Sequence, residues 1–449
     1  MKRRLRGTLI FACILWIAPP LAGQAPSINV SEGPSISLSL ESALELALSS
    51  SLSLAKTVID LGSAGIAVEN IWSLLFPGIG LSAAAGYQSP SLLPGGESGG
   101  FGYGLSLSLS LTLNFSLLER AELIRLAYST ELLNYENSRR LLEIQTAKSF
   151  YTLLAWREYI IILEEALFLA EGQLERDEGA FAAGFLGQFA LMQSRLGLEN
   201  ARYSLSAART AYASLLGEFL MLLGLELPFE EAPNRVILEG DLELARLELD
   251  PEQLIRDYLP RRPDILAQAG TIRRLELERK ARALELRSPT LTITGGYGLS
   301  GYTGTGRFAD SFRLGLGLSV PISPWIPGSA GDQAIGRADR EIEQARLDLQ
   351  NMENSAKILV RSLAERIKLS WEGIGIARSR AELAARNYDL AEQGARNGSL
   401  ESPALETARN GLVQARQQLV ENELAYKTLS LDLAAALNIH WTELSGASS

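Results

Sequence analysis

The chain has 449 residues, of which 47% are hydrophobic and 21% are charged, and its formal net charge at pH 7 is −10. This composition excludes an intrinsically disordered chain, and the acidic balance argues against a nucleic-acid-binding protein. A single cysteine, Cys13, and a single histidine, His440, leave almost no ligands for a transition-metal site and almost no partners for a catalytic triad. We therefore expect no enzymatic activity, no catalytic residue, no cofactor, no bound metal and no nucleic-acid partner.

The first 25 residues have the layout of a secretory signal peptide. A basic stretch, MKRRLRG, precedes an apolar run, TLIFACILWIA, and a small, turn-prone PPLAGQA. We expect cleavage near Ala22–Ala25, which removes the only cysteine and moves the formal charge from −10 to −14, since four basic residues are lost. Two alternatives stay open. One is a membrane anchor, although the apolar run is shorter than the about 20 residues of a spanning helix. The other is a lipoprotein modified at Cys13.

The remainder of the chain contains an internal repeat, with two copies of one structural unit. Gly184 corresponds to Gly398, and the other matched positions occur in the same order at offsets between 211 and 214 residues. Each copy predicts a helix, two strands, a long helix, a tight turn and a returning helix. The predicted division is a signal peptide over 1–25, a first repeat over 38–225, a linker over 226–248, a second repeat over 249–439 and a C-terminal tail over 440–449.

Each copy contains a pair of strands with one apolar and one small polar face. Leucine alternates with serine or threonine in residues 104–116, and apolar residues alternate with glycine, serine or arginine in residues 311–320. Weaker strands precede them at 79–87 and 291–299. A half-buried sheet in a soluble domain is the alternative, but the lengths suit tilted membrane strands of about 9–11 residues. The predicted lipid-facing residues are Leu105, Leu107, Leu109, Leu111, Leu113, Phe312, Leu314, Leu316 and Leu318. The predicted lumen-facing residues are Ser106, Ser108, Ser110, Thr112, Arg313 and Ser319.

Strands can cross a bilayer only as a closed barrel, because an open edge leaves backbone groups unpaired. Four strands per chain are fewer than the about 8 of the smallest membrane barrels. The chain must therefore assemble with copies of itself. Two copies would give a barrel filled by side chains, whereas three copies would give a water-filled lumen.

The predicted long helices exceed the size of helices in globular domains. No proline occurs from about Leu118 to Ala183 or from about Asp332 to Gly398, and such runs would extend for roughly 100 Å. A heptad seam with steps of four and three residues is predicted in the second run, over Ala338, Ile342, Ala345, Leu349, Met352, Ala356, Leu359 and Leu363. A stutter is predicted between Leu363 and Ile374. A long intracellular coiled coil is the alternative.

Taken together, these features resemble the TolC-like outer-membrane efflux channels over essentially the whole mature chain. The resemblance rests on the two-fold repeat, on RRPDILAQ at 261–268, on Pro77 and Pro289 before the strands, on the glycine turns and on YKTLSLDLAAALNI at 426–439. It implies a mostly α-helical homotrimer with a long α-helical barrel in the periplasm and a 12-stranded β-barrel in outer-membrane lipid.

The resemblance also implies a function and partners. The family supplies the passive exit duct of tripartite efflux or secretion systems, together with an inner-membrane transporter and a periplasmic adaptor protein. A non-transport, envelope-spanning coiled-coil scaffold or tether is the alternative function. The implied adaptor-docking residues at the hairpin tips are Gly184, Phe185, Leu186, Gly187, Gly398, Ser399 and Leu400.

The chain departs from the family pattern near the predicted periplasmic mouth. The aspartates that follow the hairpin glycine in well-studied members are absent, and Leu400 stands where an arginine is common. Glu401 and Glu406 are the remaining candidates for mouth charges. The alternative for each is an ordinary solvated carboxylate on a helix.

Overall fold

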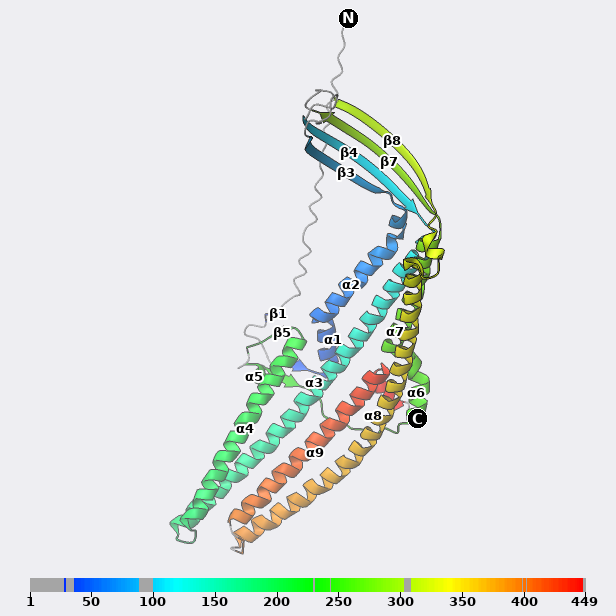
Figure 1. Ribbon diagram of the computed structural model, residues 1–449. Coiled ribbons are helices and arrows are strands. Elements are labelled where there is room, and N and C mark those ends of the chain that lie inside the picture. Colours follow the sequence, from blue (N-terminus) through cyan, green and yellow to red (C-terminus); the bar gives the residue numbers. More distant parts are fainter. Residues whose placement is uncertain are drawn as a thin grey trace.

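In the computed structural model the chain is long and narrow, with a curved sheet at one end and two helical hairpins pointing to the other end (Figure 1). The structure describes residues 28–29, 36–88, 100–228, 231–242, 244–302, 308–397, 399–400 and 402–446. The predicted signal peptide, Gly398 and Glu401 lie outside the described residues. The prediction of a mostly helical chain is confirmed.

The first copy of the unit forms two short helices, two strands and a hairpin of long helices. Ser51 ends the first helix and begins the second, its side chain accepting a hydrogen bond from the amide of Leu54. Pro77 directly precedes the first strand. The elements are α1 (Leu40–Ser50), α2 (Leu52–Glu69), η1 (Ile71–Leu75), β3 (Gly78–Gln88), β4 (Gly100–Leu113), α3 (Leu117–Ala182) and α4 (Gln188–Leu222).

The second copy repeats this order. Pro289 directly precedes its first strand, and the side chain of Ser329 caps its long helix by accepting from the amide of Asp332. The elements are α6 (Pro251–Tyr258), η2 (Leu259–Arg261), α7 (Pro263–Arg287), β7 (Thr290–Tyr302), β8 (Phe308–Ser319), η3 (Ser323–Trp325), α8 (Ala330–Arg396) and α9 (Ser402–Leu437). The short helix α10 (Trp441–Gly446) follows, in the part of the chain predicted as a tail.

Short elements connect the two copies about halfway along the long helices (Figure 1). Two small parallel pairings join the N-terminal segment to the boundary of the predicted first repeat and to the predicted linker, β1 with β5 and β2 with β6. Their bounds are β1 (Ile28–Asn29), β2 (Ile36–Leu38), β5 (Leu225–Glu226) and β6 (Val236–Leu238), with α5 (Ala232–Arg235) between the last two.

The strands of both copies form one antiparallel sheet in the order β3-β4-β7-β8. The outer strands of the sheet are therefore β3 at one edge and β8 at the other. Leu109 is paired with Ile79 on one side and Gly295 on the other, and Ser108 is paired with Gly80 and Gly296. This register keeps the alternation of every strand in step with that of its neighbours.

The helices lie side by side as a single layer with the same two edges as the sheet. Close to the sheet the order is α2, α3, α7 and α8, and towards the hairpin turns it is α4, α3, α9 and α8. No single described helix is long and apolar enough to cross a membrane, and the pair α1 and α2, which together meets that test, is bent by 49°.

Two apolar clusters hold the helices together halfway along their length. Phe150, Leu154 and Phe219 centre the first, between α3 and α4, and Val360, Ile367 and Leu433 centre the second, between α8 and α9. Each fully buried side chain of this size contributes about 1.5–3 kcal/mol by leaving water.

The predicted heptad seam of α8 departs from the structure at one position, Leu359, and its last residue, Leu363, is buried as predicted. Val360 is fully buried, whereas Leu359, which the seam included, is 43% exposed. Ile367 is also buried, within the predicted stutter between Leu363 and Ile374. The second apolar cluster, to which α6 and α9 contribute, determines which side of α8 is covered at this point. The expectation for Leu359 was therefore wrong.

Candidate functional site

The pairing register places the two predicted sets of strand residues on opposite faces of the sheet. Paired residues of an antiparallel sheet project to the same side. Leu107 is paired with Leu81 and Tyr297, while Ser106 is paired with Ser82 and Gly298. One face is thus mainly apolar, and the other is built mainly from glycine, serine and threonine, with Arg313 among them. Which face meets lipid stays a prediction.

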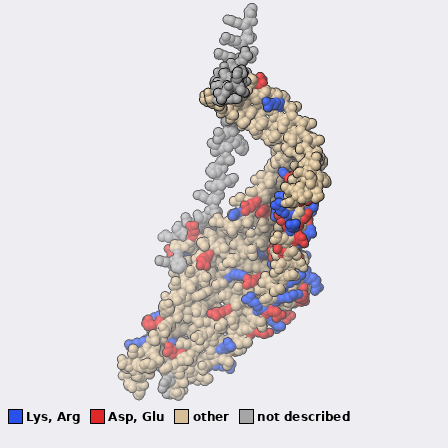
Figure 2. Space-filling model, viewed as in Figure 1, with Lys and Arg blue, Asp and Glu red and all other residues tan. Residues whose placement is uncertain are grey.

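The apolar face is open in the single chain. Phe312, Leu314, Leu316 and Leu318 of β8 are between 71% and 76% exposed. The sheet carries very few charged side chains, whereas Lys, Arg, Asp and Glu are spread over the helices (Figure 2). A largely apolar surface of this extent indicates contact with lipid or protein.

The hydroxyl groups of the polar face have short-range partners. The Ser82 and Ser106 hydroxyls are 2.7 Å apart, and Ser108 donates to the carbonyl of Gly80 over 3.3 Å. These bonds lie across strand pairs and keep the side chains close to the backbone. The face therefore presents a shallow, hydrogen-bonding wall, as a water-filled lumen requires.

Both hairpin turns lie at the end of the molecule farthest from the sheet (Figure 1). Gly184 has φ of +78°, and the amide of Phe185 donates to the carbonyl of Ala180 over 2.8 Å. This left-handed turn explains the glycine, since other residues are strained there. Gly187 directly precedes α4.

The second turn is described at Ser399 and Leu400, whose amides both donate to the carbonyl of Gly394, over 2.9 and 3.2 Å. Phe185 in the first turn is 88% exposed and Leu400 is 38% exposed, while Leu186 is half-buried. The fold thus brings the described residues of the predicted docking set to one end. Their docking role stays a prediction.

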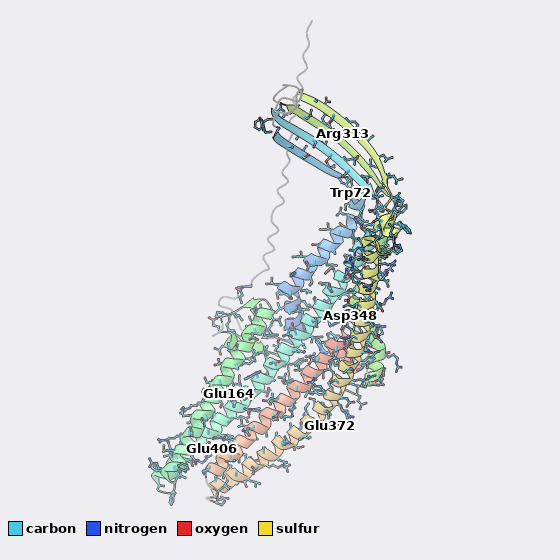
Figure 3. The ribbon with its side chains drawn as sticks, in the orientation of Figure 1. Trp72, Glu164, Arg313, Asp348, Glu372 and Glu406 are labelled. Carbon is cyan, nitrogen blue, oxygen red and sulfur yellow. The ribbon has the colours of Figure 1, made fainter. Side chains whose placement is uncertain are left out.

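Glu406, a predicted mouth charge, lies in the second turn of α9 (Figure 3). Its side chain is only 22% exposed, and its Oε1 lies 3.9 Å from Nη2 of Arg409. Glu406 is therefore a partly buried partner of an arginine. Glu401, the other candidate, lies outside the described residues.

A buried polar cluster joins the two hairpins close to their turns, and it was not predicted from sequence. Arg409 of α9, Gln173 and Asp177 of α3 and Ser194 of α4 are all buried. Arg409 Nη1 lies 3.5 Å from Gln173 Oε1, and Ser194 donates a hydrogen bond to Asp177. Burial lowers the pKa of the Arg409 guanidinium, while Glu406 opposes this shift.

A glycine inside a helix was the available signal for this cluster. A side chain at Gly197 of α4 would come within 2.7 Å of Glu406 Oε1 and 3.3 Å of Arg409 Nη2. Helix interiors disfavour glycine by about 1 kcal/mol relative to alanine. Its presence here therefore indicates that another group needs the space.

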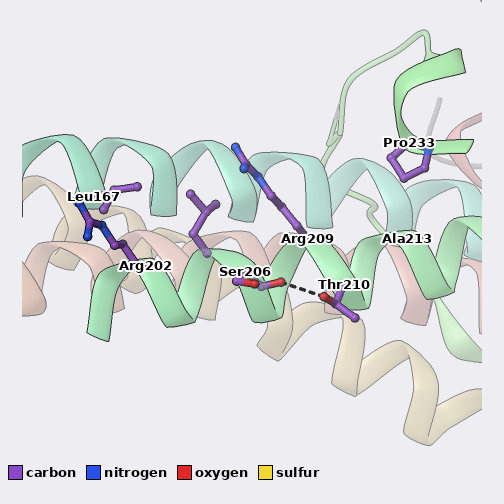
Figure 4. A pocket seen from close by; sticks show the side chains of 8 residues that line it. Leu167, Arg202, Ser206, Arg209, Thr210, Ala213 and Pro233 are labelled. Atoms are coloured by element: carbon purple, nitrogen blue, oxygen red, sulfur yellow. Dashed lines mark hydrogen bonds between the residues drawn. The ribbon is translucent and has the colours of Figure 1, made fainter. Parts of the chain in front are cut away.

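The first hairpin carries a ladder of ion pairs with seven-residue spacing. Its rungs are Arg195–Glu178 at 3.0 Å, Arg202–Glu171 at 3.6 Å and Arg209–Glu164 at 2.7 Å. All six side chains are largely exposed, so each rung contributes only about 0–1 kcal/mol. The regular spacing of these ion pairs fixes the alignment of α4 along α3. Arg202 and Arg209 also line an open groove along α4 with Leu167, Ala213 and Pro233 (Figure 4).

The RRPD segment stabilises the N-terminus of α7. Arg262 binds Asp264 with both ends of its guanidinium, Nε to Oδ1 at 3.0 Å and Nη2 to Oδ2 at 2.7 Å. Asp264 Oδ1 also accepts the amide of Ile265 over 2.9 Å. The hydrogen bond from Arg262 lowers the pKa of the Asp264 carboxyl, although burial opposes it. Pro263 begins the helix, as suits its fixed φ.

Among the described residues, His440 contacts its neighbours in the sequence. Its ring stacks on Trp441 at 4.0 Å between centroids, and its Nδ1 is 2.7 Å from the Thr442 hydroxyl. In the part of the chain that the structure describes, no group of three or more His, Cys, Asp or Glu side chains is arranged to hold a metal ion.

The sequence profile of a protein family described as outer membrane efflux protein matches residues 43–224 and 254–438. The chain belongs to this family. The resemblance to TolC-like outer-membrane efflux channels is therefore confirmed, and this efflux protein is a protein of the outer membrane. No curated protein sequence matches it significantly.

Solved outer-membrane channels share the fold of this efflux protein. The Campylobacter jejuni CmeC outer membrane channel has a TM-score of 0.73 at 17% identity, over 91% of this chain and 89% of CmeC. For the Vibrio cholerae outer membrane protein VceC the TM-score is 0.69 at 15% identity, over 90% and 96% of the two chains. The open Neisseria gonorrhoeae MtrE outer membrane channel has a TM-score of 0.65 at 16% identity, covering 89% of each chain.

Proposed function

We propose that this efflux protein is the passive exit duct of a tripartite efflux or secretion system. In this function it carries substrates from an inner-membrane transporter across the periplasm and the outer membrane. The observation that carries the proposal is that one chain combines a two-faced sheet with two helical hairpins, whose longer helices, α3 and α8, have 66 and 67 residues. Helices of that length extend for roughly 100 Å, which suits a duct that reaches from the outer membrane into the periplasm.

We propose that three copies close the duct. The sheet has two outer strands, β3 and β8, and an unpaired edge is not tolerated in lipid. Pairing β8 of each copy with β3 of the next gives a closed barrel of 12 strands, which leaves a lumen. The same rotation places α8 of one copy against α2 and α4 of the next, since these helices form the two edges of the layer.

The internal repeat supports this contact between copies. Within the chain, Leu169 of α3 packs against Leu405 and Leu412 of α9. Equivalent residues of the two repeats lie 214 positions apart, as Gly184 and Gly398 do. The equivalents of these three residues are Leu383 of α8 and Leu191 and Leu198 of α4. We therefore expect Leu383 of one copy to contact Leu191 and Leu198 of the next. Leu383 is 64% exposed in the single chain, so a next copy can cover it, whereas Leu191 and Leu198 are already buried, at 6% and 5% exposed.

The same offset identifies a place between copies where an arginine is present but its acidic partner is absent. Arg416 of α9 pairs with Glu165 of α3, and the corresponding positions are Arg202 of α4 and Ser379 of α8. A glutamate at position 379 would thus meet Arg202 of the next copy. Two matched variants follow from this. Leu383→Asp should weaken the proposed contact between copies, and Ser379→Glu should preserve it.

Native mass spectrometry and planar-bilayer recording test the proposal together. We expect a trimer that conducts ions, a trimer weakened by Leu383→Asp, and a trimer that persists in Ser379→Glu. A stable monomer or a four-fold ring contradicts the assembly. A trimer that conducts no ions contradicts the duct and favours the envelope-spanning scaffold or tether.

We further propose that the hairpin tips dock the periplasmic adaptor. The tips are the described parts farthest from the sheet, and the exposed Phe185 is an apolar group that a solvated turn does not need. The docking set is the one predicted from sequence, at Gly184–Gly187 and at 398–400.

A further inference from the structure

Arg313 is the only charged side chain that the described residues place on the small polar face of the sheet. It lies on β8 (Figure 3), and the pairing of β8 with β7 sets it opposite Gly296. Gly296 is paired with Ser108, and Ser108 with Gly80, so the row across the sheet is otherwise small and neutral. Position 313 also lies near the middle of β8 (Phe308–Ser319).

The guanidinium of Arg313 has no carboxylate partner among the described residues. The nearest acidic residue in the strand, Asp310, is paired with Leu299 and so belongs to the opposite, apolar face. Every other described side chain on the polar face is glycine, alanine, serine or threonine. The positive charge on this face is therefore not neutralised by the sheet itself.

We propose that Arg313 forms a ring of three guanidinium groups around the lumen and gives the duct a preference for anionic solutes. The inference rests on the proposed function, because the ring needs the closed barrel. Arginine stays charged at all physiological pH values. Charges on low-dielectric walls raise the local concentration of counter-ions, and arginine or lysine rings produce anion preference in pores. The solutes favoured would carry carboxylate, sulfonate or phosphate groups.

The small residues around Arg313 are part of the inference. Its neighbour in this row, Gly296, has no side chain, and the next residue, Ser108, is small, so the arginine side chain can extend into water with no neighbour of its own size in the sheet. A lumen charge that is held in water acts over about one Debye length, near 8 Å at physiological ionic strength. The preference should therefore weaken as the salt concentration rises.

The test is the reversal potential of the purified trimer in a planar bilayer under a KCl gradient. We expect the wild-type potential to lie towards the chloride equilibrium potential. Arg313→Gln should move it towards zero, and Arg313→Glu should move it further, towards the potassium equilibrium potential. Both shifts should shrink when the experiment is repeated at high KCl. Native mass spectrometry of each variant confirms that the trimer is intact.

Two control variants separate the position of the charge from its mere presence. Ser311→Gln changes the same face of β8 without altering charge, and Asp310→Asn removes a charge from the opposite face. Both should keep the wild-type reversal potential. An Arg313→Gln trimer that conducts with the wild-type potential overturns the inference and leaves the duct intact. Absence of conduction in the wild-type trimer contradicts the proposed function, and the inference with it.

Discussion

Arg409 of α9 lies against Gln173 of α3 with Nη1 3.5 Å from Oε1, and both side chains are buried. The contact links the two hairpins of one chain close to their turns. Glu406 beside it is the only carboxylate with an ion-pair distance to Arg409 in the described residues, at 3.9 Å. The relative position of the two hairpin tips therefore depends on a polar contact as well as on apolar packing.

Arg409→Leu should loosen the hairpins, because Gln173 and Glu406 would lose a partner in a mostly buried site. A buried polar group that loses a hydrogen-bond partner costs up to about 1–3 kcal/mol. We expect faster amide hydrogen exchange in α3 and α4 around Gln173 and Ser194, with the exchange of the sheet unchanged. Arg396→Leu is the control, since its pair with Glu392 is exposed and contributes about 0–1 kcal/mol. Equal exchange in both variants would show that the buried contact does not hold the hairpins.

Charge placed on the two faces of β4 should have unequal effects. Leu109→Arg puts a charge on the proposed lipid face, at a cost of about 2–4 kcal/mol at mid-bilayer. Ser108→Arg puts the same charge in the proposed lumen, where water solvates it. The amount of assembled trimer recovered from membranes measures the difference. If both variants lose assembled protein to the same extent, the assignment of the faces is wrong.

Charge at the hairpin tips should abolish export without affecting assembly. Leu186→Asp combined with Leu400→Asp removes two apolar groups from the proposed docking surface. Gly184→Val strains the turn, since φ is +78° there. We expect normal trimers and failed efflux in cells that contain the complete pump.

Gln188→Asp is the matched control for the tips, because it adds a charge in the same region and removes no apolar group. It should retain efflux. Normal efflux by the doubly charged tip variant would move the docking surface away from the tips and onto the sides of the helices.

The Arg262–Asp264 pair should give a pH-dependent contribution to stability. Asp264 has a lowered pKa in the folded chain because of the hydrogen bond from Arg262. Its contribution is therefore complete above the unfolded pKa of about 3.9, and it is lost as the pH falls through the lower, folded pKa. Asp264→Asn should lower the thermal stability of the trimer at neutral pH. The difference from wild type should vanish in acid, as the wild-type carboxyl becomes protonated.

Glu278→Gln serves as the control for this titration, since the pair of Glu278 with Arg274 is an exposed contact within α7. Its unfolding temperature should stay close to that of the wild type at every pH. A difference between Asp264→Asn and wild type that persists below the folded pKa would assign the effect to packing.

The two-faced sheet followed from the sequence because its signal is local. In residues 104–116 a leucine alternates with a small polar residue at almost every step, and a strand turns such a pattern into two faces whatever its neighbours are. The glycine at position 184 was equally informative, since a positive φ favours glycine regardless of distant contacts.

Long-range packing decided the features that sequence reasoning missed. Leu359 and Val360 are both suitable for an apolar seam, and the cluster formed with α6 and α9 determined that Val360 is the buried one. The partner of Arg409 is 236 residues away in the chain. Arg409 is buried because helices of the two repeats pack against each other, and no sequence pattern within α9 predicts that contact. Local periodicity thus determined the elements and their faces. The tertiary structure alone decided which side chains of separate elements share an interior, because that depends on how whole helices pack.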